Sequence, residues 1–119
     1  MTTARLDLGR TGEDAALALY SARGFRPVAR NWTCRLGEID LVLSQGVLLV
    51  FCEMKSRRGG SFGAPFEAVN WTKQRKLRAL GEAFLSGWRE PVRAVRFDVA
   101  SVTVDGSGRA RVHLFEDAF

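Results

Sequence analysis

The chain has 119 residues and a formal net charge of +5, with 46% hydrophobic and 26% charged residues. These values are typical of a globular protein with one core, so we predict a single domain spanning residues 1–119. The sequence has no run of eighteen apolar residues, which argues against a membrane span. The positive charge favours polyanionic partners without choosing among them.

The first ten residues carry no apolar block of the kind that forms a secretory signal peptide. The two cysteines, Cys34 and Cys52, match no metal-binding spacing, and a single pair is weak support for a disulfide. We therefore expect a cytoplasmic protein in which both cysteines are reduced thiols.

Hydrophobic periodicity and turn residues predict seven elements in the order α-β-β-β-α-β-β. This order indicates an α/β (α+β) fold in which helices flank a mixed sheet. The first helix ends before Gly24, and an earlier start near Leu6 is left open. Residues 57–65 contain three glycines and predict a mobile loop. The expected ranges are 11–23 for the first helix, 25–31, 36–44 and 47–55 for strands, 71 or 72 to 86 for the second helix, and 92–104 and 110–115 for the last strands.

The second and third strands are predicted to form a hairpin. Gly46 can adopt the positive φ that a two-residue turn requires, so we place the turn at Gln45–Gly46. This register sets Glu38 opposite Glu53. A slip by one residue would move every side chain to the other face of the sheet, so the position of the carboxylates depends on the register.

Two carboxylates and a lysine arrive at one end of this hairpin. Because side chains alternate along a strand, Asp40, Glu53 and Lys55 share one face with Glu38. Asp40 and Glu53 become diagonal neighbours with Cα atoms roughly 7–8 Å apart. From that separation both carboxylates can hold one ion at about 2.0–2.1 Å. The crowded negative charge requires a cation or Lys55 to offset it.

A second interpretation of these carboxylates stays open. Acidic residues at strand ends are often solvated or paired with a basic neighbour, and an aspartate followed at this spacing by Glu-x-Lys also arises by chance. The strands around them are strongly apolar, which places the carboxylates at the margin of a core and favours a functional role.

Positive charge is concentrated in the segment that follows Glu53. Between residues 54 and 80, seven basic residues accompany one acidic residue, Glu67. A solvated surface would also account for such a cluster, but its position directly after the carboxylates favours contacts with a nucleic-acid backbone. The seven residues are Lys55, Arg57, Arg58, Lys73, Arg75, Lys76 and Arg78.

Seven short blocks follow one another through most of the chain. They are Leu8-Gly9-x-x-Gly12-Glu13, Arg30-Asn31-Trp32, Gly37-Glu38-Ile39-Asp40-Leu41-Val42, Val50-Phe51-Cys52-Glu53-Met54-Lys55, Phe62-Gly63-x-Pro65, Lys73-x-x-x-Leu77 and Arg96-Phe97-Asp98-Val99. In this order the blocks resemble the YraN-type family of uncharacterised bacterial proteins. That family is similar to the restriction-endonuclease-like superfamily and, within it, to Holliday-junction resolvases, so the resemblance implies a restriction-endonuclease-like fold.

The resemblance also implies roles for individual positions. Asp40 matches the metal-binding aspartate of the superfamily, and Glu53 and Lys55 match its Glu-x-Lys pair. Glu13 matches the glutamate that completes the metal site in the resolvase-like branch, although a carboxylate near a helix N-terminus is also favourable without a metal. Gln74 falls where related nucleases often keep a polar residue close to the site.

These matches imply a metal-dependent endonuclease that hydrolyses phosphodiesters of structured or branched DNA. Asp40, Glu53 and Glu13 would hold Mg²⁺ or Mn²⁺, which are hard ions that prefer oxygen ligands. Lys55 would position the attacking hydroxide. The residues expected to hold the nucleic acid are Arg57, Arg58, Lys73, Gln74, Arg75 and Lys76.

Two other functional classes stay open: a nucleic-acid-binding module with weak or no catalytic activity, and a protein-interaction domain that uses the fold as a scaffold. Asp40, Glu53 and Lys55 favour the enzyme, because a binding role needs no carboxylates facing phosphates. Resolvase-like cleavage would require two active sites across a junction and hence a homodimer, for which the sequence indicates no interface.

Overall fold

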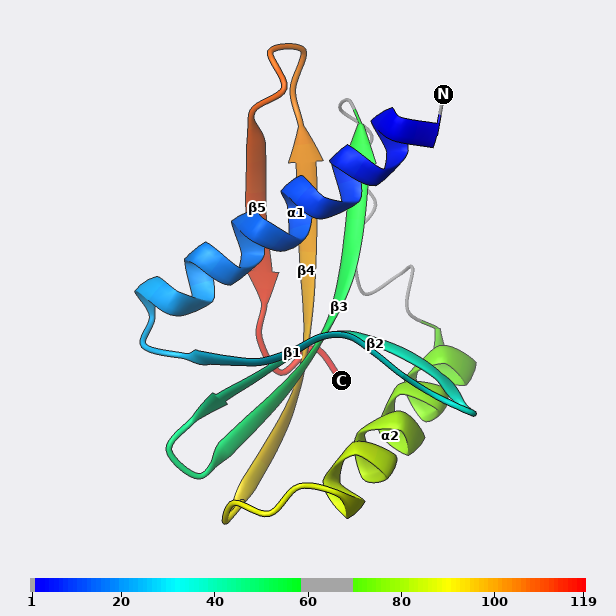
Figure 1. The fold of residues 1–119 in the computed structure, drawn as a ribbon, viewed down its shortest axis with the longest axis vertical. Helices are drawn as coiled ribbons and strands as arrows, with labels where there is room; N and C mark the ends of the chain where they lie inside the picture. The colour runs from blue at the N-terminus through cyan, green and yellow to red at the C-terminus, as the bar shows by residue number, and fades with distance from the viewer. Residues whose placement is uncertain (1, 59–69) are drawn as a thin grey trace.

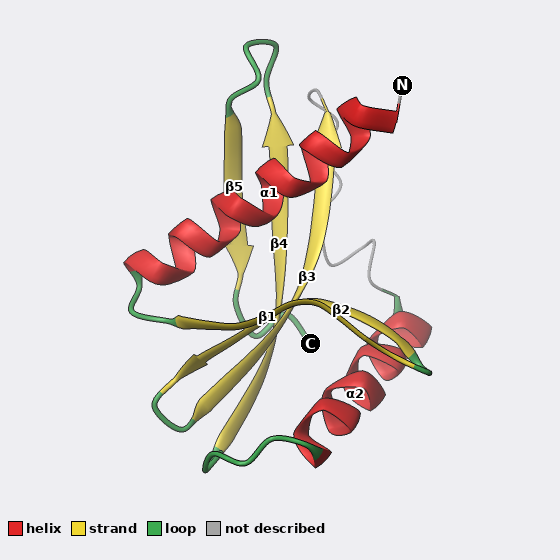
Figure 2. Cartoon of the chain, viewed as in Figure 1, coloured by secondary structure: helices red, strands yellow, loops and turns green. Residues whose placement is uncertain are grey.

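The computed structural model describes residues 2–58 and 70–119, with side chains described for 12–55 and 70–119. These residues form an α+β domain with a five-stranded mixed sheet and two helices, which confirms the predicted fold class and element order (Figures 1 and 2). The elements are α1 (Thr2–Ala22), β1 (Arg26–Cys34), β2 (Gly37–Gln45), β3 (Leu48–Arg58), α2 (Trp71–Ser86), β4 (Ala94–Val104) and β5 (Ala110–Phe115).

The strands lie in the order β1-β2-β3-β4-β5 across the sheet. Neighbouring strands are antiparallel except β3 and β4, which are parallel and lie on either side of α2 in the chain. Helix α1 crosses one face of β3, β4 and β5, whereas the β1–β2 hairpin turns away from these strands toward α2 (Figure 1). The sheet therefore opens between β2 and β3 on the side where α2 begins.

The first helix is longer than predicted, because it begins at Thr2, before both residue 11 and the earlier start near Leu6 that was left open. Good helix formers before Gly9 carry the helix through that glycine. The end of α1 agrees with the prediction: Gly24 has a φ of 88°, and the N–H of Phe25 donates to the carbonyl oxygen of Tyr20 at 3.0 Å. Neither helix in the described part of the chain is long and apolar enough to cross a membrane.

Three strand boundaries differ from the predictions by two residues or more, and several others differ by one residue. β1 continues to Cys34 because its pairing with β2 resumes after Asn31, which adopts a φ of 50° within the strand. β3 continues to Arg58 because it pairs with β4 along its whole length. The mobile loop predicted for residues 57–65 is therefore wrong at its first two residues, and the remainder lies outside the described residues. β4 begins at Ala94 rather than at residue 92.

The turn between β2 and β3 lies one residue later than predicted. It is formed by Gly46–Val47, and Gln45 pairs with Leu48. Gly46 supplies the positive φ, at 59°. The strand partners are therefore shifted by two positions from the predicted register. Because side chains alternate with a period of two, each residue keeps its predicted face although its partner changes.

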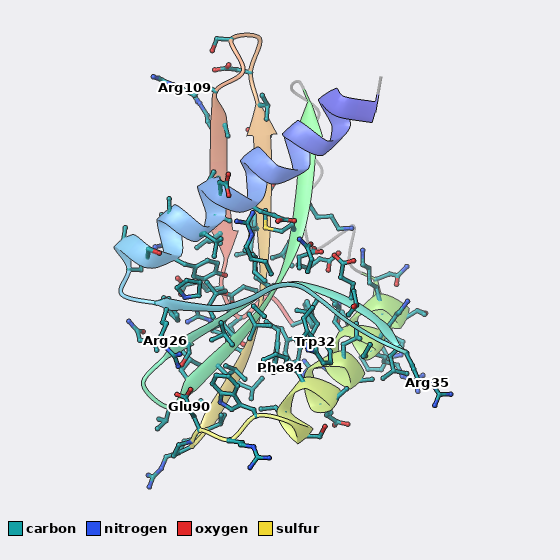
Figure 3. All side chains as sticks on the ribbon, viewed as in Figure 1. Arg26, Trp32, Arg35, Phe84, Glu90 and Arg109 are labelled. Atoms are coloured by element: carbon teal, nitrogen blue, oxygen red, sulfur yellow. The ribbon has the colours of Figure 1, made fainter. Side chains whose placement is uncertain are left out.

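Apolar side chains form a layer on each face of the sheet. On the side of α1, Tyr20 and Leu41 are completely buried. On the side of α2, Phe84 packs with Phe51, and its ring meets that of Trp32 edge-on at a centroid distance of 5.2 Å (Figure 3). Each buried side chain of this size stabilises the fold by roughly 1.5–3 kcal/mol, so both helices are held to the sheet by apolar burial.

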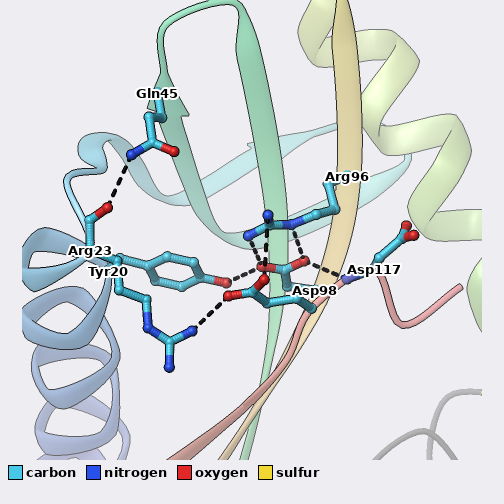
Figure 4. A network of polar contacts seen from close by, with 7 residues as sticks. Tyr20, Arg23, Gln45, Arg96, Asp98 and Asp117 are labelled. Atoms are coloured by element: carbon cyan, nitrogen blue, oxygen red, sulfur yellow. Dashed lines mark hydrogen bonds and ion pairs between the residues drawn. The ribbon is translucent and has the colours of Figure 1, made fainter.

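A buried carboxylate joins α1, β4 and the C-terminal residues (Figure 4). Asp98 is 0% exposed. Its oxygens accept hydrogen bonds from the Tyr20 hydroxyl at 2.6 Å, from Arg96 at 2.8 and 2.9 Å, and from the backbone N–H of Asp117 at 2.9 Å. These donors satisfy the buried charge, which would otherwise be strongly unfavourable.

We predict that Tyr20→Phe lowers the free energy of unfolding by about 1.5–3 kcal/mol, because it removes a hydrogen bond to this buried charge. Arg23→Ala is the control: it breaks the ion pair with Glu116 at 2.6 Å, in which the side chains are 45% and 44% exposed. An exposed pair of this kind contributes less than about 1 kcal/mol. Urea denaturation would measure both losses, and equal losses would contradict the assigned importance of burial.

Candidate functional site

The site begins at the point where β2 separates from β3. Hydrogen-bonded pairing between these strands ends at Leu41 and Cys52, while β2 continues its pairing with β1. Asp40 is the next residue of β2, and its Oδ2 accepts a hydrogen bond from the backbone N–H of Met54 at 2.8 Å. The carboxylate of Asp40 therefore takes the place of a main-chain acceptor where the two strands part.

The predicted relation between the two carboxylates requires a correction. In the predicted register Asp40 and Glu53 were diagonal neighbours, and Glu38 lay opposite Glu53. The observed register, continued by one residue beyond Leu41 and Cys52, sets Asp40 opposite Glu53. The diagonal arrangement is wrong because the turn lies one residue later, but both carboxylates remain on the predicted face.

An open pocket of about 270 Å³ lies between this strand fork and α2. Gly37, at the start of β2, packs against α2: a Cβ atom at this position would lie 3.1 Å from Cε of Lys76. The neighbouring Arg35 marks the tip of the β1–β2 hairpin beside α2 (Figure 3). The pocket is lined by Glu38, Asp40, Glu53, Lys73, Lys76, Leu77 and Leu80.

Glu53 lies between two lysines. Its Oε1 is 2.9 Å from Nζ of Lys73 and 3.7 Å from Nζ of Lys55, and the Glu53 side chain is 11% exposed. The position of Lys73 is fixed by the start of α2, where Asn70 caps the helix by accepting a hydrogen bond from the Lys73 backbone N–H at 2.9 Å. In the described structure, Lys73 supplies the closest positive charge to Glu53.

Asp40 is placed where its ionised form is unfavourable. Burial, followed by the negative charge of Glu53, raises the pKa of Asp40 to about 7. The hydrogen bond from Met54 acts in the opposite direction, and the charge of Glu38 adds to the increase. An acidic group with a pKa near neutrality inside a pocket is a common feature of functional sites.

The pKa values of Lys55 and Lys73 are shifted in opposite directions. Burial and then the nearby charge of Lys73 lower the pKa of Lys55. Burial also opposes the charge on Lys73, but its contact with Glu53 and the negative charges of Glu53 and Asp40 help to raise its pKa overall. Lys73 is therefore the better counter-charge for Glu53. The positive charge of Lys55 is stabilised less by its neighbours than that of Lys73.

Glu13, predicted to complete a metal site, has other partners. Its Oε1 accepts hydrogen bonds from Arg30 at 3.0 Å and from Asn31 at 3.3 Å. Its charge still contributes to the raised pKa of Asp40, as the last of the causes. Glu13 therefore lies within electrostatic range of Asp40 but is not among the residues that line the pocket.

The residues predicted to bind a nucleic acid do not all lie at the pocket. Lys73 and Lys76 line the pocket. Arg75 is exposed on α2, and Gln74 is half-buried. Arg57–Arg58 form the end of β3, but their side chains lie outside those that the structure describes.

The sequence analysis placed Glu38 on the face of Asp40 but gave it no role at the site, and one further feature was missed altogether. Glu38 lines the pocket. The ion pair between Lys73 and Glu53 joins residues that are far apart in the sequence, and no local pattern could have indicated it.

The pocket combines a small group of carboxylates with lysines around them, and this composition determines which ligands it could bind. Asp40 and Glu53 offer oxygens of the kind that hard divalent ions prefer. Within the described residues, no group of three or more His, Cys, Asp or Glu side chains has a geometry that could hold a metal ion. Asp40 and Glu53 are the pair of carboxylates that come together opposite each other at the strand fork in the described structure.

The fold and the pocket together define an α+β domain with a carboxylate–lysine cluster at a strand fork. Residues 12–102 match the Uncharacterised protein family UPF0102. A UPF0102 protein of Symbiobacterium thermophilum is 43% identical over 112 residues, covering 94% of this chain and 95% of that relative. One of Pelotomaculum thermopropionicum is 42% identical over 120 residues, covering 100% of both. The chain belongs to the UPF0102 family, which confirms the YraN-type resemblance.

We predict that Asp40→Asn stabilises the fold at pH 8. A carboxyl group whose pKa is raised from 3.8 to about 7 holds its proton more tightly in the folded state, so it lowers stability as pH rises through that interval. The asparagine should add on the order of 1–4 kcal/mol at pH 8 and much less at pH 4. Urea denaturation at both pH values, with chelator present, would measure this difference.

Glu82→Gln is the matched control, because it neutralises an exposed carboxylate on α2. Its effect should stay within about 0.5 kcal/mol at both pH values. An Asp40→Asn variant that is no more stable than wild type at pH 8 would contradict the unfavourable setting assigned to Asp40.

Proposed function

We propose that the protein is a metal-dependent endonuclease that hydrolyses phosphodiesters of structured or branched DNA in the cytoplasm, where Cys34 and Cys52 would persist as thiols. The observation that carries this proposal is the crowding of Asp40 and Glu53 at the strand fork, with the pKa of Asp40 raised to about 7. A fold that keeps an unfavourable acidic pair beside lysines gains little stability from it, and function explains its presence better.

The donor set fits Mg²⁺ or Mn²⁺. Mg²⁺ is commonly held by one or two carboxylates, with waters and substrate phosphates completing its ligands. Asp40 and Glu53 would hold the ion, and it would also relieve the repulsion between them. When bound, such an ion supplies charge neutralisation at the phosphate and lowers the pKa of a water molecule. Glu13 is a further candidate ligand, provided that its contacts with Arg30 and Asn31 open.

The chain's own residues would do the remaining work. Asp40 is oriented by the Met54 N–H. Lys55, whose Nζ is 3.7 Å from Glu53, would position the attacking water by hydrogen bonding. Lys73 and Lys76, at the same pocket, would bind phosphate oxygens on the substrate backbone. We extend this backbone-binding role to Arg57–Arg58, Gln74 and Arg75.

A second candidate function, a nucleic-acid-binding module with weak or no catalysis, is favoured by one contact. Lys73 already pairs with Oε1 of Glu53 at 2.9 Å, so a metal would have to share or displace this partner. If the lysine stays in place, the acidic pair is neutralised by the protein itself and the pocket only binds phosphate. Cleavage of a four-way junction would additionally require a homodimer with two such pockets.

Cleavage of labelled linear, flapped and four-way DNA with Mg²⁺ or Mn²⁺ tests the proposal. We expect Asp40→Asn and Glu53→Gln each to reduce cleavage by roughly 100-fold or more, because each loses one charge that holds the ion. DNA binding should be retained or strengthened, since each variant presents less negative charge to phosphates. Cleavage that survives both changes would exclude this pocket, and binding without any cleavage would support the binding module.

We also predict that Lys73→Met tightens Mn²⁺ binding several-fold, because it removes the cation that competes for Glu53. Lys76→Met is the matched control: it removes a lysine of the same pocket and helix for which the structure gives no ion pair with Glu53 among the described residues. Calorimetric titration with Mn²⁺ would compare the two variants. Weaker binding in Lys73→Met would show that this lysine supports the site rather than competing for it.

A further inference from the structure

The α2 side of the sheet continues beyond the carboxylate pocket toward the β4–β5 turn. Glu53 pairs with Val99, which pairs with Phe115 on β5. The next row with the same orientation is Lys55, Ser101 and His113, and the row after it includes Thr103 and Arg111. The strand pairing therefore extends the row of Glu53 into a polar surface. We name the surface formed by Lys55, Ser101, Thr103, Arg111 and His113 the β4–β5 face.

Packing on both sides of β5 fixes the orientation of this surface. Phe115 packs against the apolar cluster that contains Leu77 and Phe84 of α2. Val112 and Leu114 pack against the opposite cluster, on the side of α1. Because side chains alternate along a strand, Arg111 and His113 point to the α2 side. They therefore lie on the same side of the sheet as Glu53, on the face that α1 does not cover.

The β4–β5 face is accessible and basic within the described structure. Arg111 and His113 are exposed, and Ser101 and Thr103 are half-buried. None of the five residues that form the face is acidic. Asp105, in the β4–β5 turn, is near enough for the charge of Arg111 to help lower its pKa, after the larger effect of Ser107. Its Oδ1 already accepts hydrogen bonds from Ser107 and Arg109.

We infer that the β4–β5 face binds the backbone of the nucleic acid whose phosphodiester enters the carboxylate pocket. Strands are about 4.7–4.9 Å apart, so the row from Lys55 to His113 spans roughly 10 Å of sheet. Arg111 offers a guanidinium group suited to phosphate, and Ser101 and Thr103 offer hydroxyl donors. A nucleic-acid backbone bound along this face would pass beside Lys55, whose Nζ is 3.7 Å from Oε1 of Glu53. This inference rests on the proposed function for the identity of the ligand.

The test measures DNA binding in the absence of cleavage, so its result does not depend on catalytic activity. Fluorescence anisotropy with labelled single-stranded and four-way DNA would compare wild type, Arg111→Glu and His113→Glu in chelator, over a range of salt. We expect Arg111→Glu to weaken binding roughly tenfold at low salt and to reduce the slope of log affinity against log salt by about one. Arg89→Glu is the charge-matched control, on the exposed segment between α2 and β4. It should stay within about twofold of wild type.

Each outcome decides between the two proposals. Weakened binding in the β4–β5 variants with a wild type that never cleaves would support this face and overturn the endonuclease. Cleavage by wild type with unchanged affinity in both variants would overturn this face alone. A wild type that binds no DNA would overturn both. Unchanged DNA affinity with an altered monomer–dimer equilibrium in Arg111→Glu would assign the face to a second copy of the chain and overturn the inference.

Discussion

The hydrogen bond between the Asp40 carboxylate and the Met54 N–H is the contact on which the site depends. It lies where β2 stops pairing with β3 and turns with β1 toward α2. At such a fork, a backbone N–H loses its strand partner and requires another acceptor. A carboxylate satisfies this N–H and brings a negative charge to the margin of the core. The pocket opens at this separation, between the strand fork and α2, which apolar contacts hold on the sheet.

Charge balance decides what the pocket can be. Asp40 and Glu53 repel one another in a partly buried setting, and the repulsion contributes to the raised pKa of Asp40. Lys73 reduces the net charge of the pocket by pairing with Glu53. The backbone of Lys73 is fixed by the cap at the start of α2, so the ion pair is formed by a side chain that reaches across from the helix. In the proposed function, a divalent cation or a substrate phosphate would displace Lys73 from Glu53, with which it forms an ion pair in the structure.

Much of this arrangement was predictable, because the alternation of side chains along a strand still gives the correct face when a turn is misplaced by one residue. The hairpin turn was misplaced by one residue, which shifted the partners by two positions and left Asp40 and Glu53 on the predicted face. The helix bounds of α2 followed from its apolar spacing and from Gly87. A start of α1 near Leu6 was left open, and the helix begins earlier still, at Thr2, because good helix formers precede Gly9.

Contacts between distant segments could not be predicted in the same way. The partner of Glu53 on α2 and the partners of Glu13 on β1 depend on how the crossover helix and the β1–β2 hairpin pack. Arg96 shares the strand face of Asp98 two residues away, a spacing that favours their ion pair, but the bond between Asp98 and Tyr20 depends on how α1 packs on the sheet. The sequence therefore indicated which side chains share a strand face, and packing determined which of them touch.

The proposed function requires that Asp40 and Glu53 together bind a divalent cation. Crystals soaked in Mn²⁺ would test this directly through anomalous scattering at the manganese absorption edge. We expect one strong peak within about 2.1–2.3 Å of oxygens from both carboxylates, with Lys73 moved away from Glu53. A pocket without a peak at saturating Mn²⁺, with Lys73 still paired to Glu53, would contradict it.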